Sequence, residues 1–192
     1  MTSAASPDQF PKDGLPEVAF LGRSNVGKSS LLNALVGARD LARVSSQPGR
    51  TRLVNFFRVE HALYLADLPG YGYARVARST RESWEQLVSA YLLGREALAL
   101  CVFLVDARHE PMESDEALRT FLDHHGLPYI LAATKADKLG RGALKSRERS
   151  LTTGLGRRAR AVIPVSATRH TGLQALWSQI RAATSPEVRH GH

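Results

Sequence analysis

The sequence predicts an α/β domain in three layers, in which helices cover both faces of a mostly parallel sheet of about six strands with one antiparallel strand. First, apolar runs alternate along the chain with segments of helical periodicity. Second, most of these runs are apolar throughout, as expected for parallel strands buried on both faces. Third, the turn at Glu60 and His61 is too short for a crossover, so the strands around it must be antiparallel.

Each element follows from its own local pattern. The segment 97–106 is the most apolar of the chain and is expected to be a central strand. The segment 81–93 places apolar residues at helical spacing and is expected to be a helix. The expected strands are 18–21, 53–59, 62–66, 97–106, 129–133 and 161–165, and the expected helices are 28–36, 81–93, 113–124, 142–155 and 173–182.

The chain is expected to hold one domain at 16–183, between a flexible or loosely docked tail at 1–15 and a polar tail at 184–192. Its longest apolar run is shorter than the about 20 residues that span a bilayer. The N-terminus lacks the features of a signal peptide. The single cysteine, Cys101, lies in an apolar run and is expected to be a core residue rather than a catalytic one. We therefore expect a cytoplasmic monomer without a membrane span.

The net charge of +8 is unevenly distributed. Between positions 138 and 160 the only acid is Glu148, and against it stand Lys138, Arg141, Lys145, Arg147, Arg149, Arg157, Arg158 and Arg160. A second basic set comprises Arg39, Arg43, Arg50, Arg52 and Arg58. Such asymmetry indicates a polyanionic partner such as RNA. The alternative is a solvated helix face that keeps the protein in solution.

The segment between the first strand and the first helix has the pattern G-x-x-x-x-G-K-S of a phosphate-binding loop. Its glycines let backbone N–H groups converge on phosphate oxygens, and the helix N-terminus adds further donors. The residues expected at the phosphates are Gly22, Arg23, Ser24, Asn25, Val26, Gly27, Lys28 and Ser29. The alternative is a glycine turn that binds nothing. Phosphate binding predicts the fold of a P-loop NTPase.

A second signal is the D-x-x-G sequence formed by Asp67, Leu68, Pro69 and Gly70 at the end of a predicted strand. A carboxylate there can hold Mg²⁺ directly or through water, while the Gly70 N–H can meet the γ-phosphate. Alone this pattern is common in turns, but after a phosphate loop and two strands it is specific.

A third signal is the sequence Thr134, Lys135, Ala136 and Asp137 after the strand at 129–133. The Asp137 carboxylate can accept two parallel hydrogen bonds from N1–H and the 2-amino group of guanine, which adenine cannot offer. The Lys135 stem can lie over the base. After the last strand, Val165, Ser166 and Ala167 are expected to bring a backbone N–H to the guanine O6.

Together these segments resemble the EngB/YsxC/YihA GTPases of bacteria, within the TrmE-Era-EngA-EngB-Septin-like family. The resemblance covers about 10–183 and rests on the segments 22–30, 48–51, 55–57, 67–74 and 134–137. It implies a slow GTPase that binds GTP or GDP with Mg²⁺, acts in assembly of the large ribosomal subunit and is needed for normal cell division and septation. The partner implied is the large subunit or its rRNA.

The resemblance also implies roles for single residues. Ser29 and Thr51 would ligate Mg²⁺, with Asp67 acting through water. Lys28 and Thr51 would serve catalysis, and the Asn25 side chain would help hold K⁺ against the phosphates; the alternative for Asn25 is a polar turn residue. The first nucleotide-sensing segment would add contacts from Gly49, Arg50, Thr51, Arg52 and Leu53.

Two positions depart from GTPases more broadly. The guanine motif usually opens with asparagine, whereas here Thr134 offers a hydroxyl. Ras-like proteins carry at position 71 the glutamine that orients the attacking water, and this chain has Tyr71. Because a phenol ring lacks the amide that orients this water, slow intrinsic hydrolysis is expected.

Two other functions fit part of the pattern. The first is an ATP-using P-loop enzyme such as a small kinase, against which Asp137 argues. The second is an RNA- or ribosome-binding module in which GTP mainly stabilises the fold.

Overall fold

Seven strands form one sheet in the computed structural model, which describes residues 2–37, 53–71 and 78–185 of the chain. The strand order is β1-β3-β4-β2-β5-β6-β7, and β3 runs antiparallel to both of its neighbours while the pairs from β4 to β7 are parallel. The strands are β1 (Thr2–Ala4), β2 (Glu17–Gly22), β3 (Val54–Val59), β4 (Leu63–Asp67), β5 (Leu98–Asp106), β6 (Tyr129–Thr134) and β7 (Val162–Pro164).

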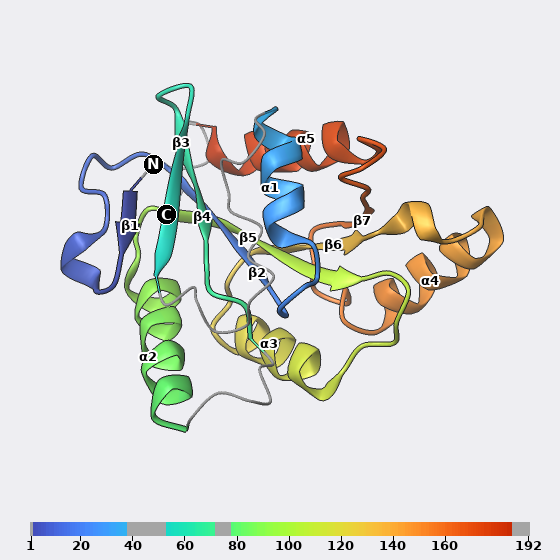
Figure 1. The fold of residues 1–192 in the computed structure, drawn as a ribbon, viewed down its shortest axis with the longest axis horizontal. Coiled ribbons are helices and arrows are strands. Elements are labelled where there is room, and N and C mark those ends of the chain that lie inside the picture. The colour runs from blue at the N-terminus through green and yellow to red at the C-terminus, as the bar shows by residue number, and fades with distance from the viewer. Residues whose placement is uncertain (1, 38–52, 72–77, 186–192) are drawn as a thin grey trace.

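In the described ranges, five α-helices cover the two faces of this sheet (Figure 1). They are α1 (Lys28–Val36), α2 (Arg78–Gly94), α3 (Glu113–His124), α4 (Arg141–Thr153) and α5 (Leu173–Thr184). One apolar cluster joins the sheet to α1 and α5 through residues such as Leu32 and Leu176. The other joins the opposite face to α2, α3 and α4 through Tyr91, Leu122 and Leu151. The predicted three-layer fold is therefore confirmed.

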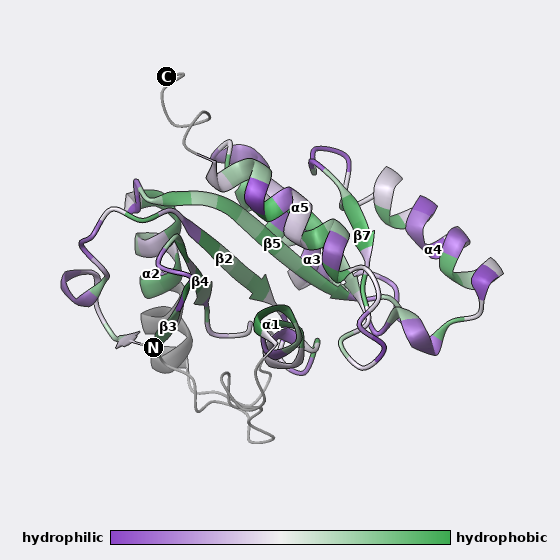
Figure 2. Cartoon of the chain, turned by 90° about the horizontal axis from the view of Figure 1, so that it is seen from above, coloured by the Kyte–Doolittle hydropathy of each residue, from purple (hydrophilic) through white to green (hydrophobic). Residues whose placement is uncertain are grey.

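The central strands are buried along their whole length or nearly so. Every residue of β2 and the last seven of β5 are buried, and Figure 2 shows both strands in the colours of apolar residues. Side chains alternate between the two apolar clusters, with Val18 and Phe20 on one face and Ala19 and Leu21 on the other. Burial on both faces explains why these runs lack a polar alternation.

The hairpin between β3 and β4 closes as its short turn predicts. Glu60 and His61 both adopt positive φ, 48° and 55°, and the Ala62 N–H donates to the Val59 carbonyl at 2.9 Å. Two consecutive positive φ values are typical of the tight turns whose twist matches antiparallel strands.

The predicted bounds of α1 and α3 agree with the structure, while α2 begins three residues earlier than expected.

The N-terminal segment differs from the flexible or loosely docked tail expected at 1–15. Residues 2–4 form β1, which pairs with β3, and a short 3-10 helix, η1 (Pro7–Gln9), follows. Phe10 is 6% exposed and its ring packs against Phe56 and Tyr91. The segment therefore adds a seventh strand to the sheet. The polar side chains of Thr2 and Ser3 gave no alternation that could have indicated a strand.

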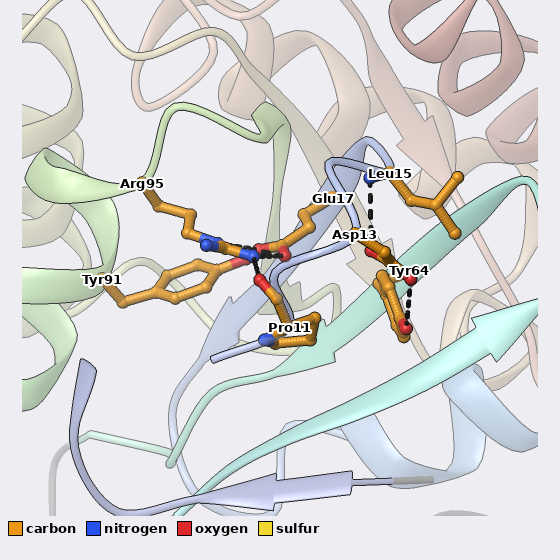
Figure 3. A network of polar contacts seen from close by, with 7 residues as sticks. All are labelled: Pro11, Asp13, Leu15, Glu17, Tyr64, Tyr91 and Arg95. Carbon is orange, nitrogen blue, oxygen red and sulfur yellow. Dashed lines mark hydrogen bonds and ion pairs between the residues drawn. The ribbon is translucent and has the colours of Figure 1, made fainter. Parts of the chain in front are cut away.

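A polar network holds this segment at the amino ends of the parallel strands (Figure 3). The Glu17 carboxylate is fully buried and accepts hydrogen bonds from the Tyr91 hydroxyl at 2.8 Å and from the Arg95 guanidinium at 3.0 Å. Arg95 also donates to the Pro11 carbonyl. Burial, followed by the Glu17 charge, raises the pKa of Tyr91 well above its ordinary value, so the phenol remains a donor. We call Glu17, Tyr91 and Arg95 the anchor network.

Candidate functional site

The phosphate loop (residues 22–29) connects the end of β2 to α1 as predicted. Gly27 has φ of 103° and lies immediately before the first residue of α1, Lys28. At Gly22 a β-carbon would lie 2.9 Å from Val26 Cγ1 and 3.1 Å from the Leu104 carbonyl oxygen. Both glycines are therefore required, one for its backbone conformation and the other for the close approach of β5. Val26 is 3% exposed and anchors the loop in the core.

Lys28 and Asp67 lie together at the carboxyl end of the sheet. The Lys28 ammonium group contacts the Asp67 carboxylate directly, and the two side chains are only 10% and 8% exposed. Asp67 ends β4, which pairs with β2 in parallel, so strand pairing carries the carboxylate to the loop. A carboxylate here and the half-buried Ser29 hydroxyl are the hard oxygen donors that suit Mg²⁺. The structure thus brings together Lys28 and Asp67, two of the predicted residues, while metal binding by Ser29 and Asp67 stays a prediction.

The D-x-x-G segment is tied to the phosphate loop by backbone hydrogen bonds. The Tyr71 N–H donates to the Gly22 carbonyl at 3.3 Å, and the Ser24 N–H donates to the Tyr71 carbonyl at 3.1 Å. A β-carbon at Gly70 would lie 3.1 Å from the Ser24 nitrogen, so glycine allows this approach. Leu68 is fully buried and its N–H donates to the Phe20 carbonyl at 3.3 Å. Gly70 is thereby held beside the phosphate loop, where the phosphates are expected to bind.

The guanine motif also contacts the phosphate loop. The Thr134 hydroxyl donates to the Val26 carbonyl at 2.6 Å and lies 3.1 Å from the Val105 carbonyl. The Lys135 ammonium group donates to the Asn25 carbonyl at 2.8 Å. Thr134, the first residue of the guanine motif, therefore links that motif to the phosphate loop through its hydroxyl group.

Asp137 is positioned by Ser166. The Ser166 hydroxyl, which is fully buried, donates to Asp137 Oδ1 at 2.7 Å. This hydrogen bond is the main cause that lowers the pKa of Asp137 below its ordinary value of 3.8. The carboxylate is therefore ionised at neutral pH and suited to accept two N–H groups from guanine.

One part of the expectation at the last strand is wrong. The Ser166 N–H donates to the Thr171 carbonyl at 3.0 Å, so it does not point at a base. The loop from 166 to 171 closes through His170, whose φ is 52°, and this closure forms the bond. A backbone N–H from Ala167 to the guanine O6 stays a prediction, and Ser166 contributes its side chain to Asp137. Val165, the third residue of this prediction, is buried.

Two acidic residues of this region were missed. Asp106 ends β5 and lies 2.9 Å from the Lys135 ammonium group. Burial opposes ionisation of Asp106, but hydrogen bonds from Arg108 and Lys135 outweigh it and lower its pKa. Its place at a strand end, the signal that identified Asp67, would have found it. Asp115, near the start of α3, accepts a hydrogen bond from the Tyr71 hydroxyl at 3.0 Å, and no local pattern indicated that contact.

Several predicted site residues lie outside the described part of the chain. They are Gly49, Arg50, Thr51 and Arg52, together with residues 72–74 of the resemblance. Leu53, the last of that predicted group, directly precedes β3 and is 36% exposed. Asn25 is described and adopts φ of 60°, a conformation that asparagine tolerates in turns.

Comparison with known proteins agrees with this geometry. The model of the 50S ribosome-binding GTPase family matches residues 17–135. A probable GTP-binding protein EngB from Solibacter usitatus is 47% identical over 180 residues, which cover 94% of this chain and 92% of the relative. The chain belongs to the EngB family of GTP-binding proteins. Another relative of the same description, from Lactiplantibacillus plantarum, is 44% identical over 183 residues, covering 95% and 93% of the two chains.

Solved structures show the same fold as this member of the EngB family. A crystal structure of a probable GTP-binding protein engB superposes with a TM-score of 0.71 at 24% identity, covering 92% of this chain and all of the other. Era in complex with MgGDPNP and nucleotides of 16S ribosomal RNA gives a TM-score of 0.72 at 22% identity, covering 89% and 57% of the two chains. The protein is a GTP-binding protein with a P-loop GTPase domain, and it has GTPase activity.

The structure also bears on the membrane span and on Cys101. Among the helices of the described ranges, none combines the length and apolar character needed to cross a membrane. Cys101 is fully buried in β5, and burial raises the pKa of its thiol to about 12. Because this thiol stays protonated, Cys101 is a core residue rather than a nucleophile.

Proposed function

We propose that the protein is a Mg²⁺-dependent GTP switch with slow hydrolysis that acts in assembly of the large ribosomal subunit. The observation that carries this proposal is the arrangement of Lys28, Asp67 and Gly70 around one phosphate loop, with Asp137 at its base end. The γ-phosphate would be met by Lys28 and the Gly70 N–H, and its loss on hydrolysis would release both contacts. The domain at 16–183 would carry this function in the cytoplasm.

Mg²⁺ fits the oxygen donors that are expected at this end of the sheet. The Ser29 hydroxyl and Asp67, acting through water, would hold the ion, and Thr51 would complete the set. The ion would neutralise charge between the β- and γ-phosphates. Lys28 lies beside Asp67 and would share this anionic region with the ion. We also propose that Asn25 helps to hold K⁺ at the phosphates, since Tyr71 stands where Ras-like proteins carry the catalytic glutamine and a cation could offset charge in the transition state.

Charge on and after α4 supports a ribosomal RNA partner. Arg141, Lys145 and Arg149 recur every four residues and are exposed, so they share one side of the helix. Arg157, Arg158 and Arg160 are exposed on the segment that follows. Figure 2 shows much of α4 in the colours of hydrophilic residues. We call these six residues the basic surface. Arg147 differs from them, because it contacts Glu110.

The relatives point to the same class of partner. The matching family model is described as a 50S ribosome-binding GTPase, and Era was solved with 16S ribosomal RNA. We propose that this chain binds the large subunit in its GTP form and that cell division and septation depend on the ribosomes it helps to assemble.

Sedimentation with purified ribosomal subunits tests the proposal. The protein is expected to co-sediment with the large subunit in the presence of a non-hydrolysable GTP analogue and to be released with GDP. Equal binding with both nucleotides would favour the alternative, an RNA-binding module in which GTP is structural.

Salt dependence tests the surface itself. The logarithm of the subunit affinity should fall linearly with the logarithm of salt concentration. The magnitude of this slope should decrease by about two to three when Arg157, Arg158 and Arg160 are replaced by glutamine, if each contacts one phosphate. An unchanged slope would identify the basic surface as a solvated face.

A further inference from the structure

Tyr71 and Arg23, from two separate segments, meet on one buried carboxylate of α3 beside the phosphate loop. Asp115 lies in the first turn of α3 and is 1% exposed. Its Oδ1 accepts the Tyr71 hydroxyl at 3.0 Å and lies 3.5 Å from Nε of Arg23. Arg23 belongs to the phosphate loop, and Tyr71 directly follows Gly70. We call Asp115, Tyr71 and Arg23 the switch network.

The carboxylate at its centre is itself fixed. Asp115 Oδ2 accepts the backbone N–H of Met112 at 2.9 Å, and this bond caps the start of α3. Arg23 also contacts the Met112 sulfur. A buried carboxylate is costly unless it is paired, and here both oxygens have partners. Asp115 therefore acts as a rigid acceptor whose position is set by α3 rather than by the nucleotide site.

Tyr71 transmits this position to Gly70. Its side chain is held by Asp115, and its backbone pairs with Gly22 and Ser24 of the phosphate loop. Burial first, and then the Asp115 charge, hold the pKa of Tyr71 far above its ordinary value of 10.0, so the phenol keeps its proton. Because the hydroxyl is engaged by α3, Tyr71 does not take the place of a water-orienting glutamine. The side chain instead fixes the peptide that precedes it.

We propose that Asp115 is a positioning residue that sets the Gly70 N–H for the γ-phosphate through Tyr71. This inference rests on the proposed function, in which Gly70 meets the γ-phosphate. GDP lacks that phosphate, so the switch network contributes to binding of GTP and not to binding of GDP. Helix α3 thereby becomes a further element that senses which nucleotide is bound, and force on α3 from a partner would alter the preference for GTP.

The test compares two tyrosines that make the same kind of hydrogen bond. Tyr71→Phe removes one hydroxyl from the switch network, and Tyr91→Phe removes one from the anchor network, where Tyr91 donates to Glu17 at 2.8 Å. The affinities of the full chain for a non-hydrolysable GTP analogue and for GDP are measured by titration calorimetry with Mg²⁺ present. We expect Tyr71→Phe to lower the ratio of the two affinities about fivefold to tenfold, which is less than the full contribution of one hydrogen bond to a charged group. Tyr91→Phe should lower the melting temperature and leave the ratio unchanged.

A second variant makes the assignment specific to Asp115. Asp115→Ala should lower the same ratio, and the double variant with Tyr71→Phe should lower it no further than Asp115→Ala alone. Circular dichroism checks that each variant folds. A ratio that stays at the wild-type value in folded Tyr71→Phe, or equal losses of analogue and GDP affinity, would overturn the inference. Equal co-sedimentation of the wild-type protein with the large subunit in the two nucleotide states would instead contradict the proposed switch, and this outcome is seen before any variant is made.

Discussion

The two ends of the sheet carry polar networks built from the same three kinds of side-chain group, but we expect the two networks to have different roles. At the amino end Glu17 binds Tyr91 and Arg95, and at the carboxyl end Asp115 binds Tyr71 and Arg23. In each, a buried carboxylate accepts a phenol and faces a guanidinium. The anchor network joins the N-terminal segment and the end of α2 to the sheet. The switch network includes Arg23 and so contacts the phosphate loop.

We infer from this comparison that the role of a polar cluster depends on its position relative to the strand ends rather than on its chemistry. Ligands of parallel α/β sheets bind at the carboxyl ends of the strands, and Asp67, Asp106 and Thr134 all end strands there. Changes at the amino end should therefore alter stability alone, and changes at the carboxyl end should alter nucleotide binding.

Removing the cation of the anchor network should have the largest effect. Arg95→Ala leaves Glu17 buried beside Tyr91 without its ion-pair partner, and we expect unfolding free energy to fall by about 3–5 kcal/mol. Urea unfolding monitored by circular dichroism measures this loss. The ratio of GTP-analogue to GDP affinity should remain at the wild-type value in the fraction that folds. A changed ratio would show that the amino end also reports on the nucleotide.

The base end of the site provides the next effect. Asp137→Asn replaces an acceptor of two N–H groups by an amide, and GDP affinity should weaken by about 3 kcal/mol. Xanthosine diphosphate should bind better than GDP, because the amide can donate to its 2-oxo group. Stability should change little, since Ser166 can still donate to the amide oxygen. Calorimetric titration measures both affinities, and unchanged GDP affinity would remove Asp137 from the base site.

These cases show which parts of the molecule were predictable from sequence. The phosphate loop was predictable because Gly22, Gly27 and Lys28 each meet a requirement that few residue types satisfy. Docking of residues 2–10 was not, because it depends on contacts such as that of Phe10 with Tyr91, which lies far along the chain. The switch network was missed for the same reason: Tyr71 and Asp115 are 44 positions apart. The Ser166 donor was misassigned because the loop that engages it closes only through Thr171.

A third effect concerns the monovalent cation. GTP hydrolysis at saturating nucleotide should be about tenfold faster in K⁺ than in Na⁺ at equal ionic strength, which corresponds to about 1.4 kcal/mol in the barrier. Asn25→Ala should abolish the difference while GDP affinity is retained. Phosphate release measures the rates. Equal turnover of the wild-type protein in the two salts would leave Asn25 as a turn residue.

The smallest expected effect is on acid stability. The pKa of Asp106 is lowered from its ordinary value of 3.8, so its contribution to folding is present above that value and is lost as pH falls through the folded pKa. Asp106→Asn should therefore destabilise at pH 7, and its difference from the wild type should narrow as pH falls from 3.8 to about 2. We expect a difference of no more than about 1 kcal/mol, because Arg108 is exposed to solvent and its charge is screened. Urea unfolding at the two pH values measures it.

Hydrogen exchange of the wild-type chain tests the contrast between the two ends most directly. The measurement compares the protein saturated with GDP and with a non-hydrolysable GTP analogue, both with Mg²⁺. We expect the analogue to slow exchange at residues 67–71 and 112–116 and to leave residues 2–17 and 91–95 unchanged. Equal exchange at the first two segments with both nucleotides, or a difference confined to the amino end, would contradict the account.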